Sequence, residues 1–136
     1  MICPCSHVMF DTNILIAAIL NKHGVPNMAV QKVSELPYVF VLCDQILEEF
    51  RRFFNQKVPS LIPDMEEFLA SSRYSIVTLT ADDVAGCDEG TIRDVNDRPI
   101  LRAARKAGVD VFVTGDKDFL ESNVTNPRIM TAAQFL

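Results

Sequence analysis

The nearly continuous apolar run at residues 38–43, YVFVLC, restricts the fold more than any other feature of this sequence. A strand without alternating polar positions suits a parallel sheet, in which helices cover both faces. Further short strands are predicted at residues 8–10, 75–79, 111–113 and 128–130. Helical patterns of apolar residues separate these strands. The alternation predicts an α/β fold, a single-domain α/β/α sandwich with a parallel sheet of about five strands.

The helices are predicted from apolar residues spaced three and four positions apart. Thr12 offers a capping side chain to a helix over residues 14–21, and Asp44 offers one to a helix over residues 45–57. Gly108 is expected to end a helix that begins at Asp97. The remaining predicted helices cover residues 29–36, 65–74 and 82–85.

Size and charge limit the classes of function. The 136 residues, 49% of them hydrophobic, suit one compact domain over residues 1–136, with residues 1–6 as a short N-terminal extension. The formal net charge of −5 excludes a bulk positive field that would attract nucleic acid. Binding of RNA would therefore depend on local basic residues or on bound cations.

The cysteines and the apolar stretches indicate the compartment. Cys3, Cys5, Cys43 and Cys87 form no paired CxxC framework, and we assign no function to the first two. Residues 1–7 lack the basic start and the apolar run of a secretory signal. No stretch approaches the roughly 20 apolar residues that cross a bilayer. We therefore expect a soluble protein of the reducing cytoplasm that does not bind membranes.

Four acidic residues stand out by their positions. Asp11 and Asp116 each follow a predicted strand, Asp97 begins a helix, and Glu49 lies beside an apolar helix stripe. Ligands of parallel α/β sheets bind beyond the carboxyl ends of the strands, where the first two acids are expected. If all four converge, their oxygen atoms suit Mg²⁺ or Mn²⁺.

The two adjacent glutamates of the helix over residues 45–57 are not equivalent. At about 100° per residue, Glu48 points away from the apolar stripe, four residues before Arg52, which is the spacing of an exposed ion pair. Glu49 lies on the flank of the stripe, where a carboxylate can enter a cleft. A shift of one residue in the helix phase would weaken this preference for Glu49.

Each acid also has an ordinary structural explanation. Asp11 and Asp97 can cap helices, and Glu49 can be a solvated helix residue. Asp116 and Asp118 can be turn residues beside a glycine. The joint pattern favours a site, because acids after two strands crowd negative charge at one sheet edge unless a cation compensates.

Four segments in register carry a family resemblance: FDTNILIAAIL, ILEEFRRFF, DVNDRPILRAARKAG and VFVTGDKDFL. Together they resemble the PIN-domain family, and specifically its toxin-like branch related to VapC-type ribonucleases. The resemblance implies that Asp11, Glu49, Asp97 and Asp116 are the site acids. Asp118 is then a plausible auxiliary metal ligand, and the loop residue Asp94 is a further candidate.

The same resemblance implies an activity and partners. It implies an endoribonuclease that depends on Mg²⁺ or Mn²⁺ and is the toxin of a toxin–antitoxin pair. RNA would be the substrate, a cognate antitoxin the protein partner, and the chain a homodimer. The main alternative is a non-catalytic PIN-like module that binds metal or nucleic acid. An aspartyl-phosphate phosphatase is disfavoured, because Asn13 stands where its second acid is needed.

The basic residues near these acids leave two interpretations open. One side of the helix that begins at Asp97 carries three arginines, and two more adjoin Glu49: Arg98, Arg102, Arg105, Arg51 and Arg52. They can form a solvated helix face. Alternatively, they hold RNA phosphates near the metal.

Overall fold

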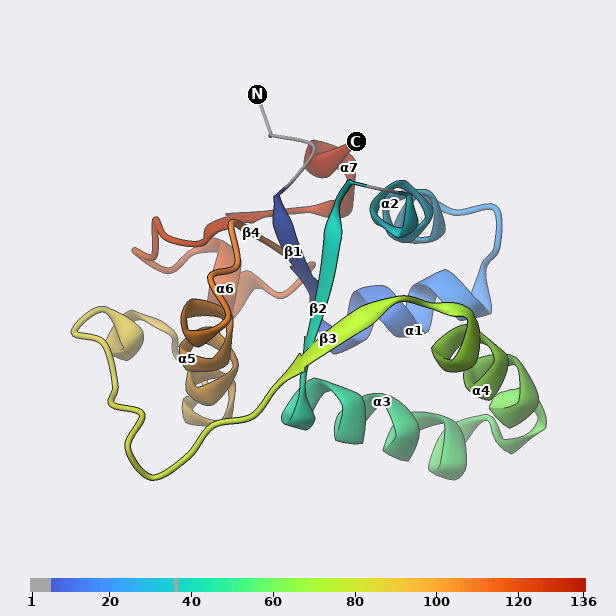
Figure 1. The fold of residues 1–136 in the computed structure, drawn as a ribbon, viewed down its shortest axis with the longest axis horizontal. Helices are drawn as coiled ribbons and strands as arrows, with labels where there is room; N and C mark the ends of the chain where they lie inside the picture. Colours follow the sequence, from blue (N-terminus) through green and yellow to red (C-terminus); the bar gives the residue numbers. More distant parts are fainter. Residues whose placement is uncertain (1–5, 36) are drawn as a thin grey trace.

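The computed structural model describes residues 6–35 and 37–136 as a central sheet with helices on both sides (Figure 1). The strands are β1 (His7–Phe10), β2 (Val39–Cys43), β3 (Tyr74–Val77), β4 (Val111–Val113) and β5 (Arg128–Met130). The helices are α1 (Thr12–Leu20), α2 (Val25–Ser34), α3 (Asp44–Lys57), α4 (Ile62–Ser71), α5 (Arg98–Lys106), α6 (Lys117–Leu120) and α7 (Ala132–Phe135). Short 3₁₀ turns cover Pro59–Leu61, Glu89–Thr91 and Val95–Asp97. Cys3, Cys5 and the Leu36 end of the predicted second helix lie outside the described residues.

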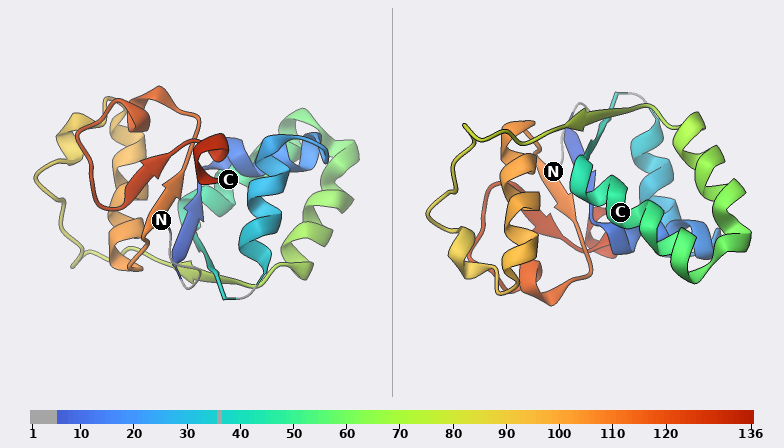
Figure 2. Two further views of the ribbon diagram at one scale, coloured as in Figure 1. Left: turned by 90° about the horizontal axis from the view of Figure 1, so that it is seen from above. Right: turned by 90° about the horizontal axis from the view of Figure 1, so that it is seen from below.

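The sheet has five parallel strands in the order β3-β2-β1-β4-β5. The helices α1 to α4 follow β1 and β2, whereas α5 belongs to the connection that crosses back from β3 to β4. Figure 2 shows α2 and α4 on one side of the strands and α5 on the other. The predicted α/β class with a parallel sheet of five strands is confirmed. The order in which strands are added to the sheet reverses between β1 and β4. Such a point of reversal is where α/β folds bind ligands.

The central strands are buried because their residues are apolar on both faces. Val8, Met9 and Phe10 of β1 are 0% exposed, and residues 40–43 of β2 are at most 4% exposed. The edge strand β3 differs, since Ile76 is 49% exposed. The ring of Phe10 packs edge to face against Phe40 at a centroid distance of 5.7 Å. The predicted covering of YVFVLC on both faces therefore holds for the middle of the sheet.

Several predicted boundaries are wrong for identifiable reasons. The fourth helix begins at Ile62 with Pro63 in its first turn, where proline needs no hydrogen-bond partner. The predicted helix over residues 82–85 is absent from this described segment. Instead, the Asp83 carboxylate accepts hydrogen bonds from the Thr80 backbone (2.6 Å) and from Lys106 (2.8 Å), which fixes a turn.

Two predicted helix caps are also corrected. The cap of α1 is Asp11, whose carboxylate accepts from the Thr12 backbone N–H, so Thr12 is the first helical residue. The residue that precedes α3 is Cys43, and no side chain caps this helix. Asp44 lies in its first turn. Gly108 follows α5 with a φ of +69°, which confirms its role as the helix stop.

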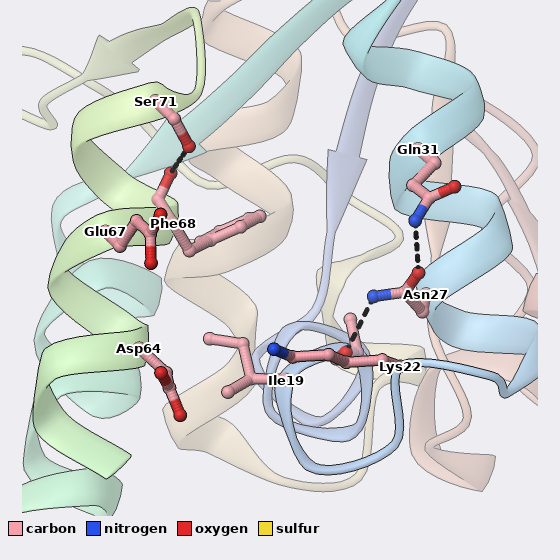
Figure 3. Close-up of a pocket in the computed structure, with 9 residues that line it drawn as sticks. Ile19, Lys22, Asn27, Gln31, Asp64, Glu67, Phe68 and Ser71 are labelled. Atoms are coloured by element: carbon pink, nitrogen blue, oxygen red, sulfur yellow. Dashed lines mark hydrogen bonds between the residues drawn. The ribbon is translucent and has the colours of Figure 1, made fainter.

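A hollow of about 280 Å³ lies between α1, α2 and α4 (Figure 3). Phe68 points into it from α4, and Asn27 closes one side through a 2.8 Å hydrogen bond to the Ala18 carbonyl. None of the predicted site acids lines this hollow. No helix among the described residues is both long and apolar enough for a membrane span.

Substitution of Gly108 by alanine should lower the free energy of unfolding by about 1 kcal/mol. An added Cβ meets no atom within 4 Å, so the cost arises from the left-handed φ alone. Urea unfolding of Gly108→Ala and of the control Gly90→Ala measures it, since Gly90 has equal space and no left-handed φ. An equal loss in both variants would contradict this explanation.

Candidate active site

Asp11 and Asp116 lie at the ends of neighbouring strands. β1 pairs with β4 so that Phe10 lies opposite Val113. The Asp11 backbone N–H donates to the Val113 carbonyl at 2.9 Å, which continues the pairing by one residue. Asp116 follows β4 after two residues and caps α6. The sheet therefore presents both acids at the crevice where its strand order changes direction.

Thr114 connects these two acids. Its side chain is fully buried, and its hydroxyl donates to Asp11 Oδ2 at 2.7 Å. The same hydroxyl oxygen accepts from the Asp116 backbone N–H at 3.0 Å. Sequence reasoning missed this residue. The available signal was a hydroxyl side chain between a fully apolar strand and an acid.

Asp11 is a buried carboxylate without a cationic partner among its described contacts. It is 6% exposed, and its Oδ1 accepts from the Thr12 backbone at 2.8 Å. Burial raises its pKa to about 6, against the lowering effect of hydrogen bonds from Thr114 and Thr12. The charges of Asp116 and Glu49 raise it further. Capping of α1 therefore accounts for one oxygen of Asp11 but not for its charged surroundings.

Glu49 enters the same crevice from α3. Its Oε1 accepts from the Thr12 hydroxyl at 2.8 Å, and its Oε2 accepts from the Gln45 amide at 3.3 Å. Glu48 points away, with a side chain that is 74% exposed and 3.5 Å from Arg52. The predicted ion pair between Glu48 and Arg52 is confirmed. The Thr12 hydroxyl, which was predicted to cap a helix, instead orients Glu49.

Asp97 experiences the charges of all the other acids of the crevice. Burial raises its pKa to about 7, and the carboxylates of Asp11, Asp94, Asp116 and Glu49 contribute in that order. Its side chain caps no helix, although it precedes α5. A capping role therefore does not explain Asp97. Its pKa is raised first by burial and further by the negative charges that meet there.

Among the described residues, one set of three acids lies close enough to share a metal ion, and of the four predicted site acids it contains Asp97 alone. Carboxylate oxygens of Asp94, Asp97 and Asp118 lie within 4.8 Å of one another, a spacing that can hold a metal ion. Asp118 is also paired with Arg93 at 2.8 Å, and Asp94 accepts from the Asn96 backbone. Asp118 and Asp94, which sequence reasoning left at the margin, thus lie beside the other acids. We call Asp11, Glu49, Asp97 and Asp116, with Asp94 and Asp118 beside them, the acidic crevice.

Comparisons with known proteins identify the family and the fold. A sequence model of the family described as PIN domain matches residues 7–118. The chain belongs to the PIN-domain family. Its fold is similar to that of a chain in the crystal structure of VapBC2 from Rickettsia felis bound to a DNA fragment from the promoter. The TM-score is 0.65 at 20% identity, and the match covers 91% of this chain and 96% of that chain. No curated protein matched.

The arginines of α5 in this PIN domain have a different role from either one predicted. Arg102 donates to both oxygens of Glu89 at 2.7 and 3.1 Å, and Arg105 to both oxygens of Asp88 at 2.6 Å. Arg98 donates to the Ile92 carbonyl at 3.0 Å. These side chains therefore anchor the loop over residues 83–97 to α5. They form neither a solvated face nor a free set of phosphate contacts.

Glu89 shows how strong this anchoring is. It is only 3% exposed, and burial alone would raise its pKa. Hydrogen bonds from Arg102 and from the Gly86 backbone outweigh burial, so its pKa is lowered. The loop that carries Asp94 and Asp97 is thus held against α5 by the ion pair between the buried Glu89 and Arg102. Arg51, near Glu49, is likewise paired with Glu66.

Replacement of Asp97 by asparagine should change the pH dependence of stability. The folded-state pKa of about 7 exceeds the ordinary 3.8, so the stabilisation is complete near pH 4 and is lost as pH rises through 7. With chelator present, Asp97→Asn should equal the wild type near pH 4 and exceed it by about 1 kcal/mol near pH 8. Urea unfolding at both values measures the difference.

Asp82→Asn is the matched control, because Asp82 is an exposed aspartate outside the acidic crevice. It should change stability little at either pH. If Asp97→Asn behaved as this control does, Asp97 would not share the charges of the other acids.

Loss of the Arg102 guanidinium should destabilise the PIN domain by about 3 kcal/mol, because a buried Glu89 remains unpaired. Arg52→Ala is the control, since its ion pair with Glu48 is exposed and contributes at most about 1 kcal/mol. Chemical unfolding of Arg102→Ala and Arg52→Ala compares the two. Equal losses would show that the loop does not depend on the buried pair.

Proposed function

We propose that this PIN domain is a metal-dependent endoribonuclease, the toxin component of a toxin–antitoxin pair, that hydrolyses phosphodiester bonds of RNA. The observation that carries the proposal is the gathering of carboxylates around Asp97. Oxygen atoms of Asp94, Asp97 and Asp118 lie within 4.8 Å of one another. Burial, together with the charges of the neighbouring acids, raises the pKa of Asp97 to about 7. Such a cluster is unfavourable unless a cation binds or protons are taken up. Membership of the PIN-domain family supports nuclease activity as the use of this cluster.

The donor set fits a hard divalent cation. Carboxylate oxygens from separate elements, with no histidine or cysteine among them, suit Mg²⁺ or Mn²⁺ rather than zinc. Asp11, Asp97 and Asp116 would hold the ion, with Glu49 and Asp118 beside them. When bound, the ion would lower the pKa of a water molecule and neutralise charge on the scissile phosphate.

The protein residues supply orientation. The Thr114 hydroxyl fixes Asp11 and the start of the Asp116 turn, so both carboxylates keep their direction. The Thr12 hydroxyl and the Gln45 amide hold the two oxygens of Glu49. We assign to Glu49 the orientation of the attacking water for in-line displacement. The family resemblance suggests products with a 5′-phosphate and a 3′-hydroxyl.

The partners follow from the same resemblance. We propose RNA as substrate, an antitoxin protein as inhibitor, a homodimer as the assembly and the cytoplasm as the compartment. The similarity in fold to a chain of VapBC2 from Rickettsia felis supports the toxin branch of the family. We also propose that residues 1–136 form a single domain.

Asp11→Asn and Asp97→Asn should each reduce RNA cleavage in Mn²⁺ by at least about 100-fold, since each removes an anionic ligand. Chelator should abolish cleavage by the wild type. Asp82→Asn, outside the acidic crevice, should cleave as the wild type does. Gel analysis of a labelled RNA measures all four. Undiminished cleavage by both site variants would eliminate the proposed centre.

Thermal unfolding separates metal binding from catalysis. Mn²⁺ should raise the Tm of the wild type and of Asp82→Asn but change that of Asp97→Asn much less. A rise in Tm without cleavage of any RNA would favour the alternative, a non-catalytic module that binds metal or nucleic acid.

A further inference from the structure

A second cavity lies directly beside the acidic crevice. Its volume is about 330 Å³, within the range of small-molecule sites. The end of β2, the residues at and after the end of β3, and α5 form its apolar walls, and α3 adds the polar side chains of Asp44, Gln45 and Glu48. The wall residues are Cys43, Val77, Leu79, Pro99 and Ala103. We call this cavity the side pocket.

The side pocket and the acidic crevice share a wall. Gln45 lines the side pocket, and its amide donates to Glu49 at 3.3 Å and to the Asn96 carbonyl at 2.7 Å. Pro99, on the α5 side, follows Asp97 by two residues. A molecule in the side pocket would therefore lie next to any group held by the acids.

The rim of the side pocket carries hydrogen-bond acceptors. Asp44 and Glu48 line it from the first turns of α3, and both residues are exposed. One oxygen of Glu48 lies 3.5 Å from Arg52, which reduces its attraction for a second cation. A carboxylate in this state still accepts hydrogen bonds from amino groups. Apolar walls with acceptors at the rim suit a flat, uncharged ligand that carries N–H donors.

We propose that the side pocket binds a nucleobase that carries an exocyclic amino group. This inference rests on the proposed function, because RNA would place such a base one sugar away from the scissile phosphate. Carboxylates accept from the amino group of cytosine, whereas uracil presents an oxygen at the same position. The pocket would therefore favour cleavage beside cytosine or adenine over uracil.

Nucleoside binding tests the side pocket without catalysis. Metal-free protein is titrated with cytidine, uridine, adenosine and inosine, and the NMR shifts of the Val77 and Leu79 methyl groups are followed. Cytidine should bind about three- to tenfold more tightly than uridine, and adenosine more tightly than inosine, since in each pair an amino donor stands where the other nucleoside carries a carbonyl oxygen. Glu48→Gln should reduce this discrimination. Val77→Trp should abolish binding by filling the cavity.

N-acetylarginine amide is the competing ligand. Tighter binding of this compound than of every nucleoside would assign the side pocket to a basic peptide and overturn the proposal. Glu121→Gln is the matched control, because Glu121 is an exposed glutamate 3.5 Å from an arginine and does not line the side pocket. It should bind nucleosides as the wild type does.

Cleavage of an RNA with all four bases keeps the two proposals separate. The wild type should cut beside cytosine or adenine more often than beside uracil, and Glu48→Gln should cut with less preference but still require Mn²⁺. Nucleoside binding without RNA cleavage would overturn the nuclease and leave the side pocket. If the RNA were cleaved but nucleosides caused no NMR shifts, and Glu48→Gln kept the base preference of the wild type, the proposal for the side pocket would be overturned and the nuclease proposal would stand.

Discussion

The parallel pairing of β1 with β4 is the constraint on which the candidate site depends. Phe10 and Val113 lie opposite each other, and one further hydrogen bond ties Asp11 to the end of β4. These strands are separated in sequence by about 100 residues, yet the pairing brings their acids to one crevice. Both strands are buried on both faces, so a shift of register would draw the acids that flank them, Asp11 and Asp110, into the sheet. The stability of the core thereby fixes the position of the acids.

The hydroxyl groups of Thr114 and Thr12 donate hydrogen bonds to the Asp11 and Glu49 carboxylates and so stabilise them within the fold. A carboxylate that is 6% exposed must obtain hydrogen bonds from the protein, and Asp11 obtains one from Thr114 and one from the Thr12 backbone. Neutral donors satisfy the oxygen atoms without cancelling the negative charge. The crevice therefore keeps its negative charge, whereas a lysine or arginine at either position would have neutralised it.

The sequence was sufficient to predict the five strands, the longer helices and the orientation of the glutamates, because these depend on local periodicity, whereas the helix expected over residues 82–85 is absent. The run YVFVLC and the strand VFV are predicted to be buried because all their residues are apolar. The apolar stripe of α3 predicts that Glu49 lies beside the buried face and that Glu48 faces solvent. The cap of α1 could not be decided, since Asp11 and Thr12 are adjacent residues that both favour caps. Long-range contacts decided it: Thr114 and Glu49 engage these two side chains.

The arginines of α5 show the limit of single-helix reasoning. Their spacing correctly places them opposite the apolar face, but it carries no information about what lies over that face. Glu89 and Asp88 come from a loop with no periodic pattern, and they contact Arg102 and Arg105 because the tertiary fold places this loop against α5. Helical periodicity therefore predicts which face a residue occupies, whereas the partner of that residue depends on the tertiary fold.

The acids of the loop over residues 83–97 and of the acidic crevice fall into two groups by the direction in which their pKa is shifted. Asp83, Asp88 and Glu89 contact Lys106, Arg105 and Arg102, and the pKa of each is lowered. Asp11 and Asp97 have raised pKa values, and the charges that act on them are negative. The nearest arginine in sequence, Arg98, bonds to a backbone carbonyl instead of to Asp97. Arg93 pairs with Asp118 at 2.8 Å, whereas Arg98, Arg102 and Arg105 anchor the loop. Negative charge therefore stays concentrated around Asp11 and Asp97.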